Sequence, residues 1–153
     1  MHITPKQPQS AADPSWRIGI LHSAWYPEVV LPMVDDAKKT LIDADIPVEN
    51  ITLHACTGSF EIPLIGSALA ESGSVDALIA LGVIVKGQTH HADLIAAEVA
   101  RGVMQVQLQH QIPFAFEVLY VDSLELAKQR TDKGRAAAHT TLQSLKQLQG
   151  IVQ

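Results

Sequence analysis

The 153-residue sequence contains one cysteine, Cys56, so no disulfide can form within the chain. A lone cysteine is more often a small buried residue than a nucleophile. Aromatic residues make up only 5%, and no apolar run approaches the roughly 20 residues of a membrane-spanning helix. Basic residues are also scarce, 11 against 16 acidic ones, and the formal charge of −5 argues against a nucleic acid or an anionic membrane as the main partner.

The N-terminal segment differs in character from the rest of the chain. Residues 1–15 are polar and contain proline, and they lack the apolar core of a signal peptide. We therefore predict a flexible arm over residues 1–15, a single domain over residues 16–153, and a cytoplasmic location. A domain of this length can bury a core without disulfides or metals.

Short apolar runs alternate with stretches of helical spacing along this domain. The runs that predict strands are 17–22, 51–55, 75–85 and 114–121. Helices are predicted over 27–44, 60–72, 89–109 and 135–149, with a short one beginning at Asp122. This alternation predicts an α/β fold in which a four-stranded parallel sheet lies between two helical layers.

Several residues indicate how these helices begin and which face they bury. Ser59 is an expected N-cap, Asp122 with Glu125 forms a capping-box pattern, and Gly73 is an expected helix end. The buried face of the 89–109 helix is expected to consist of six apolar residues. These are Leu94, Ala97, Val99, Val103, Val106 and Leu108.

Segments that follow the predicted strands contain polar, aromatic and titratable residues that could bind a ligand. In an open parallel sheet, ligands bind beyond the carboxyl ends of the strands. The run Gly87-Gln88-Thr89 opens a long helix whose N–H groups and dipole favour an anion. An ordinary N-cap at Thr89 is the alternative. The run matches neither the GxxxxGK[ST] phosphate loop nor the GxGxxG dinucleotide motif.

Five further residues each allow a functional and a structural interpretation. His90 and His91 point about 100° apart on a helix, so both cannot face one pocket, and either one transfers protons or is a solvated surface side chain. Trp25 fits a stacking surface for a heterocycle or an interface anchor. Arg130 fits a phosphate clamp or a solvated side chain, and Glu61 a ligand for hydroxyl groups or a favourable charge at a helix start.

Taken together, these residues resemble the lumazine synthase family over about residues 17–148. Residues 58–64, GSFEIPL, are similar to the family's G-[AS]-[FY]-E-[IL]-P segment, and residues 81–93, LGVIVKGQTHHAD, to its L-G-x-V-I-[RK]-G-x-T-x-H-[FY]-[DE] segment. Residues 104–108, MQVQL, are similar to a divergent second type found in some bacteria.

The resemblance implies a flavodoxin-like α/β/α sandwich and an enzyme of riboflavin biosynthesis. The family condenses 5-amino-6-(D-ribitylamino)uracil with 3,4-dihydroxy-2-butanone 4-phosphate to 6,7-dimethyl-8-ribityllumazine, releasing phosphate and water. It uses no metal and no organic cofactor. Family sites lie between adjacent subunits of a pentamer, so we expect at least a homopentamer, with riboflavin synthase as a further candidate partner.

The resemblance also implies roles for particular residues. Trp25 stacks on the pyrimidine ring, Glu61 binds the ribityl hydroxyls, and His91 rather than His90 is the catalytic histidine. Backbone contacts to the same substrate come from four residues. These are Ser59, Phe60, Ile84 and Val85. The phosphate is bound by Gln88, Thr89 and Arg130, and Phe116 is a pocket aromatic supplied by a neighbouring subunit.

This chain departs from the family pattern at three places. Ala92 stands where the family has Phe or Tyr, Tyr26 stands where Asn is usual, and the segment after Arg130 is several residues shorter. Ala92 and the shortened segment motivate an alternative function, a non-catalytic oligomer that binds flavins or lumazines on the same scaffold.

Overall fold

The computed structural model describes residues 12–152, in which strands and helices alternate as expected. The strands are β1 (Ile18–Ser23), β2 (Ile51–Cys56), β3 (Ala77–Val85) and β4 (Phe114–Val121). The helices are α1 (Pro27–Asp43), α2 (Ile62–Ser72), α3 (His91–His110), α4 (Leu124–Lys128) and α5 (Lys133–Val152), with 3₁₀ turns η1 (Val48–Asn50) and η2 (Ser59–Glu61). Most of the expected arm, residues 1–11, lies outside the described residues, so the division into arm and domain stays a prediction.

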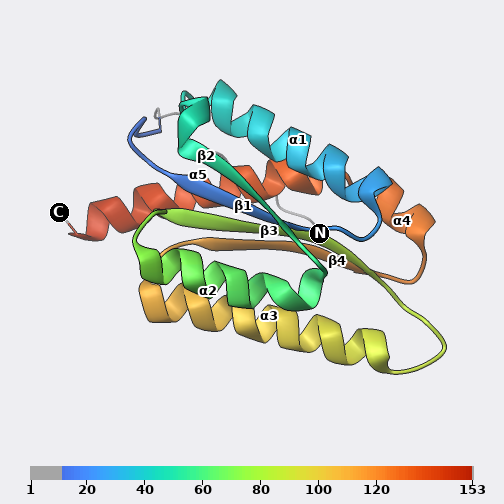
Figure 1. Ribbon diagram of the computed structural model, residues 1–153. Coiled ribbons are helices and arrows are strands. Elements are labelled where there is room, and N and C mark those ends of the chain that lie inside the picture. The colour runs from blue at the N-terminus through green and yellow to red at the C-terminus, as the bar shows by residue number, and fades with distance from the viewer. Residues whose placement is uncertain (1–11, 153) are drawn as a thin grey trace.

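The four strands form one parallel sheet in the order β2-β1-β3-β4. Helices α1 and α5 cover one face and α2 and α3 cover the other, which gives three layers (Figure 1). The predicted α/β sandwich is therefore confirmed. The chain leaves β1 toward β2 on one side and then crosses to β3 on the other, so the strand order reverses between β1 and β3.

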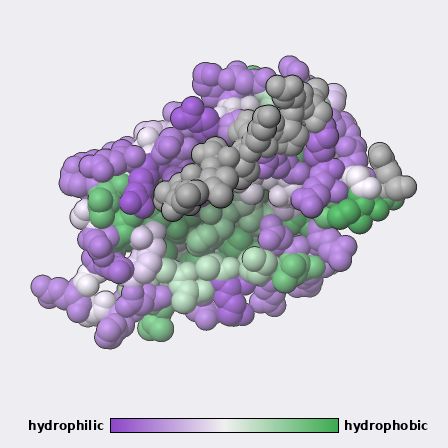
Figure 2. All heavy atoms as spheres, turned by 180° about the vertical axis from the view of Figure 1, so that it is seen from behind, coloured by the Kyte–Doolittle hydropathy of each residue, from purple (hydrophilic) through white to green (hydrophobic). Residues whose placement is uncertain are grey.

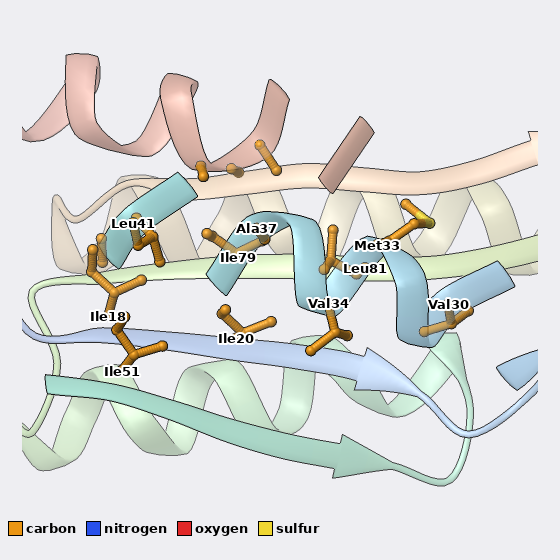
Figure 3. Packing of buried hydrophobic residues seen from close by; sticks show 14 of the residues in the cluster. Ile18, Ile20, Val30, Met33, Val34, Ala37, Leu41, Ile51, Ile79 and Leu81 are labelled. Carbon is orange, nitrogen blue, oxygen red and sulfur yellow. The ribbon is translucent and has the colours of Figure 1, made fainter. Parts of the chain in front are cut away.

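Both faces of the sheet are apolar because helices cover both of them. Residues 77–84 of the central strand β3 are all buried, as expected for a parallel strand between two helical layers. On one face, Val34 and Ala37 of α1 lie over Ile20 and Ile79 of the sheet (Figure 3). These contacts fix the end of β1, from which the segment leading to α1 departs.

Four predicted helix starts are displaced from the observed ones. For two of them, α2 begins at Ile62 rather than 60 and α5 at Lys133 rather than 135. The third long helix begins at His91, so Thr89 lies in the preceding turn. The N-cap of α4 is Ser123 rather than Asp122, because Ser123 has the extended backbone that an N-cap needs (φ −148°, ψ 155°). Its hydroxyl accepts a hydrogen bond from the Leu126 N–H at 3.4 Å.

The apolar face of α3 was also predicted only in part. The residues of α3 that are buried line the side toward α2 and the sheet. These are Ala92, Val99, Val103 and Val106. Leu94, Ala97 and Leu108 are exposed instead, because the helix carries apolar residues on more than one side and only one side is covered.

Helices α1 and α5 cross at Gly134, where the two backbones touch. A Cβ atom on Gly134 would overlap the carbonyl oxygen of Met33 and would lie 2.8 Å from its carbonyl carbon. Only a glycine allows this approach, because the obstacle is backbone and not a side chain that can rotate away. The contact holds the start of α5, just beyond Arg130, against the second turn of α1.

Candidate active site

The carboxyl ends of the four strands meet at one edge of the sheet. Ser23 at the end of β1 lies opposite Cys56 of β2, and Val85 of β3 lies opposite Val121 of β4. The Ala24 N–H donates to the Cys56 carbonyl oxygen at 2.9 Å, so the segments after β1 and β2 begin side by side. This edge, at the reversal of strand order, is where a ligand is expected.

Trp25, Gly58 and Glu61 lie against one another at this edge. A Cβ atom on Gly58 would be 3.4 Å from Cδ1 and Nε1 of the Trp25 indole and 3.8 Å from Oε1 of Glu61. The Trp25 N–H donates to Oγ of Ser23 at 3.1 Å, and the Trp25 side chain remains 63% exposed. The arrangement offers a flat apolar surface next to a hydrogen-bond acceptor.

Two polar atoms in the same segment are buried without hydrogen-bond partners among the described residues. They are Oγ of Ser59 and Oε2 of Glu61. An unpaired buried polar atom costs on the order of 1–3 kcal/mol, and more when it is charged. Since buried polar atoms are nearly always paired, these two favour a ligand that brings hydroxyl or N–H groups.

The N-cap role predicted for Ser59 is wrong. The residue opens η2 and is only 7% exposed, and α2 begins three residues later without a side-chain cap. Its hydroxyl instead faces β3, where a Cβ atom on Gly82 would lie 2.6 Å from Oγ. The glycine in β3 thus makes room for Ser59, which spacing along the chain does not reveal. Phe60, the next residue, is exposed.

The connection from β3 to α3 runs outward from this area. Ile84 is buried and Val85 half-buried, whereas residues 86–91 are exposed. Oγ1 of Thr89 accepts a weak hydrogen bond from the His91 N–H at 3.4 Å, and α3 has no side-chain bond from its N-cap residue. The first turn of α3, next to Gln88, therefore presents N–H groups to solvent, as an anion site at a helix N-terminus requires.

The two histidines of this connection have different surroundings. Nδ1 of His90 lies 3.3 Å from Oδ2 of Asp93, and the His90 side chain is 97% exposed. The imidazole of His91 forms no ion pair or side-chain hydrogen bond within residues 12–152. His91 is thus the more available of the two for a ligand, and its catalytic role stays a prediction.

Arg130 lies in a tight turn between α4 and α5. Its N–H donates to the Ala127 carbonyl oxygen at 2.9 Å, and its own carbonyl accepts from the Lys133 N–H at 3.1 Å. Only Thr131 and Asp132 separate it from α5. The turn follows β4 and therefore begins at the same edge of the sheet as the segments described above.

Phe116 is not brought to Trp25 within one chain. It lies on the edge strand β4 opposite Ala80, while Tyr120, four residues later, lies opposite Ile84 at the end of the strand. Four residues of strand span roughly 13 Å, and β3 separates β4 from β1. The Phe116 side chain is 40% exposed, so its surface is available to another molecule.

Lys86, Tyr120 and Asp122 form a cluster at the ends of β3 and β4 that was not predicted from the sequence. Nζ of Lys86 lies 3.4 Å from Oδ1 of Asp122 and 4.9 Å from the centre of the Tyr120 ring. The contacts follow from strand register, because Ile84 lies opposite Tyr120 and Lys86 lies two residues after Ile84, just beyond the end of β3. Spacing along the chain does not provide that register.

Cys56 is buried at the end of β2, as predicted for a small structural residue. Burial raises the pKa of its thiol, and the nearby Glu61 raises it further. The thiol is therefore protonated near neutral pH and is a poor nucleophile. Within residues 12–152, no cluster of three or more His, Cys, Asp or Glu side chains is placed to hold a metal ion. None of the described helices is both long and apolar enough to cross a membrane.

Residues 15–149 match the sequence model of a family described as 6,7-dimethyl-8-ribityllumazine synthase. A protein of that name from Chlorobium limicola is 46% identical over 100 residues, which are 62% of this chain and 64% of the relative. Another from Chloroherpeton thalassium is 38% identical over 116 residues, which are 72% of this chain and 75% of the relative. The matched part thus spans somewhat less than two-thirds of the first relative.

Proposed function

Because the chain belongs to the 6,7-dimethyl-8-ribityllumazine synthase family, we propose that it catalyses this synthase reaction of riboflavin biosynthesis. It would join 5-amino-6-(D-ribitylamino)uracil to 3,4-dihydroxy-2-butanone 4-phosphate. One observation carries the proposal: buried Oε2 of Glu61 and Oγ of Ser59 have no hydrogen-bond partner within residues 12–152, and they lie beside the exposed indole of Trp25. A ribityl-pyrimidine supplies both a flat ring and a row of hydroxyl donors.

The pyrimidine substrate occupies the edge between β1 and β3 in this proposal. Its ring stacks on Trp25, and its ribityl hydroxyls donate to the Glu61 carboxylate, since hydrogen bonds to an ionised acceptor are the stronger ones. Further contacts come from backbone groups at the end of β3 and in η2. They belong to Ser59, Phe60, Ile84 and Val85.

The butanone phosphate binds at the start of α3. Gln88, Thr89 and the first-turn N–H groups surround the phosphate, and Arg130 approaches from the segment after β4. Helix N–H groups together with a guanidinium neutralise a phosphate without a metal ion.

The chemistry requires positioning and proton transfer. The ring amine attacks the ketone to give an imine with loss of water, phosphate is eliminated, and the resulting enol tautomerises to a ketone. The ribitylamino nitrogen then attacks that carbonyl and closes the second ring with loss of a second water. Each step moves a proton, and an imidazole ring can donate and accept one, which is the role proposed for His91. Holding the two substrates together supplies much of the remaining acceleration.

The purified protein incubated with both substrates is expected to form the lumazine, measured by its absorbance and fluorescence. His91→Ala should lower kcat by about 100-fold, the lower end of the effect of a general acid–base group, and should leave binding of the pyrimidine substrate intact. The neighbouring variant His90→Ala is the matched control and should keep kcat within about two-fold, because His90 contacts Asp93 along the helix surface.

Three results would contradict this proposal or part of it. Absence of product under conditions in which a known synthase works would refute the activity, and tight riboflavin binding without turnover would instead favour the non-catalytic flavin or lumazine binder. A fully active His91→Ala protein, or an inactive His90→Ala protein, would refute the assignment of the acid–base role to His91.

We propose further that the protein assembles at least as a homopentamer with sites between subunits. In support, Trp25, Phe60 and Phe116 are exposed on a single chain. The rear view of the molecule also shows apolar atoms gathered across the middle of one face, between polar rims (Figure 2). Exposed apolar areas of this kind mark association surfaces. Light scattering at micromolar concentration should give a mass of at least five chains, and a monomer would refute the assembly.

Two finer expectations belong to the same proposal. The cytoplasmic location is tested by fractionating cells, and an association with riboflavin synthase by co-purification of the two proteins.

A further inference from the structure

The proposed phosphate site is built from two connections that are separate in the sequence. One follows β3 and contains Gln88 and Thr89, and the other follows β4 and leads through α4 to Arg130. Strand pairing aligns them only as far as Val85 and Val121. Beyond that pair, side chains have to set the distance between the two halves of the site.

Lys86 makes the polar contacts that join these two connections within residues 12–152. Its N–H donates to the Val121 carbonyl oxygen at 2.9 Å, which extends the β3–β4 ladder by one residue. Its ammonium lies 3.4 Å from Oδ1 of Asp122 and 4.9 Å from the centre of the Tyr120 ring. The side chain is thus folded back across β4 at the residue before Gly87.

Each side-chain contact of Lys86 is weak by itself. Together, the ion pair with Asp122 and the contact with the Tyr120 ring hold one flexible side chain in place. Asp122 is exposed and Lys86 is about half-exposed, and ion pairs at such sites contribute little. A cation over an aromatic ring at an exposed site changes an equilibrium constant about two- to five-fold. Holding the lysine in one orientation removes the rotamer freedom that would otherwise be lost when a ligand binds.

We propose that Lys86 is a positioning residue for the phosphate-bearing substrate. Held by Tyr120 and Asp122, it fixes the Gly87–Thr89 segment relative to the segment that carries Arg130. The inference rests on the proposed function for the identity of the ligand. Phosphate binding should therefore depend on where the Lys86 side chain is held as well as on its charge.

Binding of inorganic phosphate to the full-length protein, measured by calorimetry at low ionic strength, tests this claim without turnover. Lys86→Met should weaken phosphate binding about five- to ten-fold, and Tyr120→Leu, which keeps the charge and removes the ring, about three-fold. The matched controls are Lys86→Arg, which keeps the charge, and Tyr120→Phe, which keeps the ring. Both should bind within about two-fold of the wild type.

Lys86→Met and Tyr120→Leu should change KM for only one of the two substrates, whereas a general structural defect would affect both. KM for the butanone phosphate should rise by the factors seen for phosphate, while KM for the pyrimidine substrate and the thermal midpoint stay near the wild-type values. Lys86→Arg and Tyr120→Phe should keep the KM for the butanone phosphate near the wild-type value.

Two results would overturn the inference. One is phosphate binding within two-fold of the wild type for both Lys86→Met and Tyr120→Leu. The other is weakened binding in Lys86→Met with no change in Tyr120→Leu, because charge alone would then explain the effect. A protein that makes no lumazine but binds phosphate in a manner dependent on Lys86 and Tyr120 would refute the proposed function and support the positioning role.

Discussion

Replacing Gly134 with alanine is expected to lower the free energy of unfolding by about 3 kcal/mol, the upper end of the usual cost of overpacking. The added Cβ would overlap the carbonyl oxygen of Met33 and lie 2.8 Å from its carbonyl carbon. Alanine is otherwise preferred to glycine within helices by about 1 kcal/mol, but the clash is with backbone, so α1 and α5 would have to separate. Denaturant unfolding at one fixed protein concentration measures the loss.

Gly150→Ala is the matched control for this prediction. Gly150 lies on the same helix, and a Cβ atom there would meet nothing within 4 Å. This substitution should leave stability unchanged or raise it by up to about 1 kcal/mol. A Gly134→Ala protein as stable as the wild type would mean that the two helices can move apart at little cost, and the close approach would then lose its structural importance.

Glu61→Gln is expected to weaken binding of the ribityl-pyrimidine substrate by about 10- to 100-fold while the folded protein keeps its stability. Hydrogen bonds to a charged acceptor contribute about 1.5–3 kcal/mol, and the amide of glutamine replaces one acceptor oxygen by a donor. Oε2 of Glu61 has no partner among the described residues, so removing the charge breaks no bond at that atom. Equilibrium binding of the pyrimidine and thermal unfolding measure the two effects.

A loss of affinity without a loss of stability separates a binding residue from a structural one. Glu49→Gln is a suitable control, because Glu49 is exposed in η1, before the amino end of β2, and should change neither quantity. Wild-type affinity in Glu61→Gln would contradict the role of Glu61. A large loss of stability would instead indicate that the carboxylate supports the fold.

Strand positions were predictable because the sheet is covered on both faces. The run 114–121 is apolar for this reason, and β4 spans the same residues. The run 75–85 was predicted two residues too long, because Asp76 is held by Arg17: its Oδ2 accepts from the Arg17 N–H at 2.8 Å. That contact joins residues far apart in the sequence, so the local pattern does not contain it.

The parts of the site that lie on one segment were easier to predict than those that depend on register. The sequence pattern placed Gly87–Thr89 just before the long helix that begins at His91, and it separated His91 from His90, whose surroundings do differ. It did not reveal that Gly82 makes room for Ser59 or that Lys86 lies on Tyr120. Both contacts depend on which strands are neighbours and in what register, information that spacing within one chain does not carry.

The crossing of α1 and α5 at Met33 and Gly134 has a consequence for how this protein can evolve. Helix α1 starts just after Trp25 and α5 starts just after Arg130, and the crossing lies within about two turns of both starts. Under the proposed function, Trp25 stacks on one substrate and Arg130 binds the phosphate of the other. The distance between these two residues is therefore set by how α1 and α5 pack. Selection on substrate geometry and selection on folding act on the same pair of residues. The two-residue connection at Thr131 and Asp132 lies outside the crossing, so lineages can lengthen or shorten it, and change the reach of Arg130, without disturbing the core.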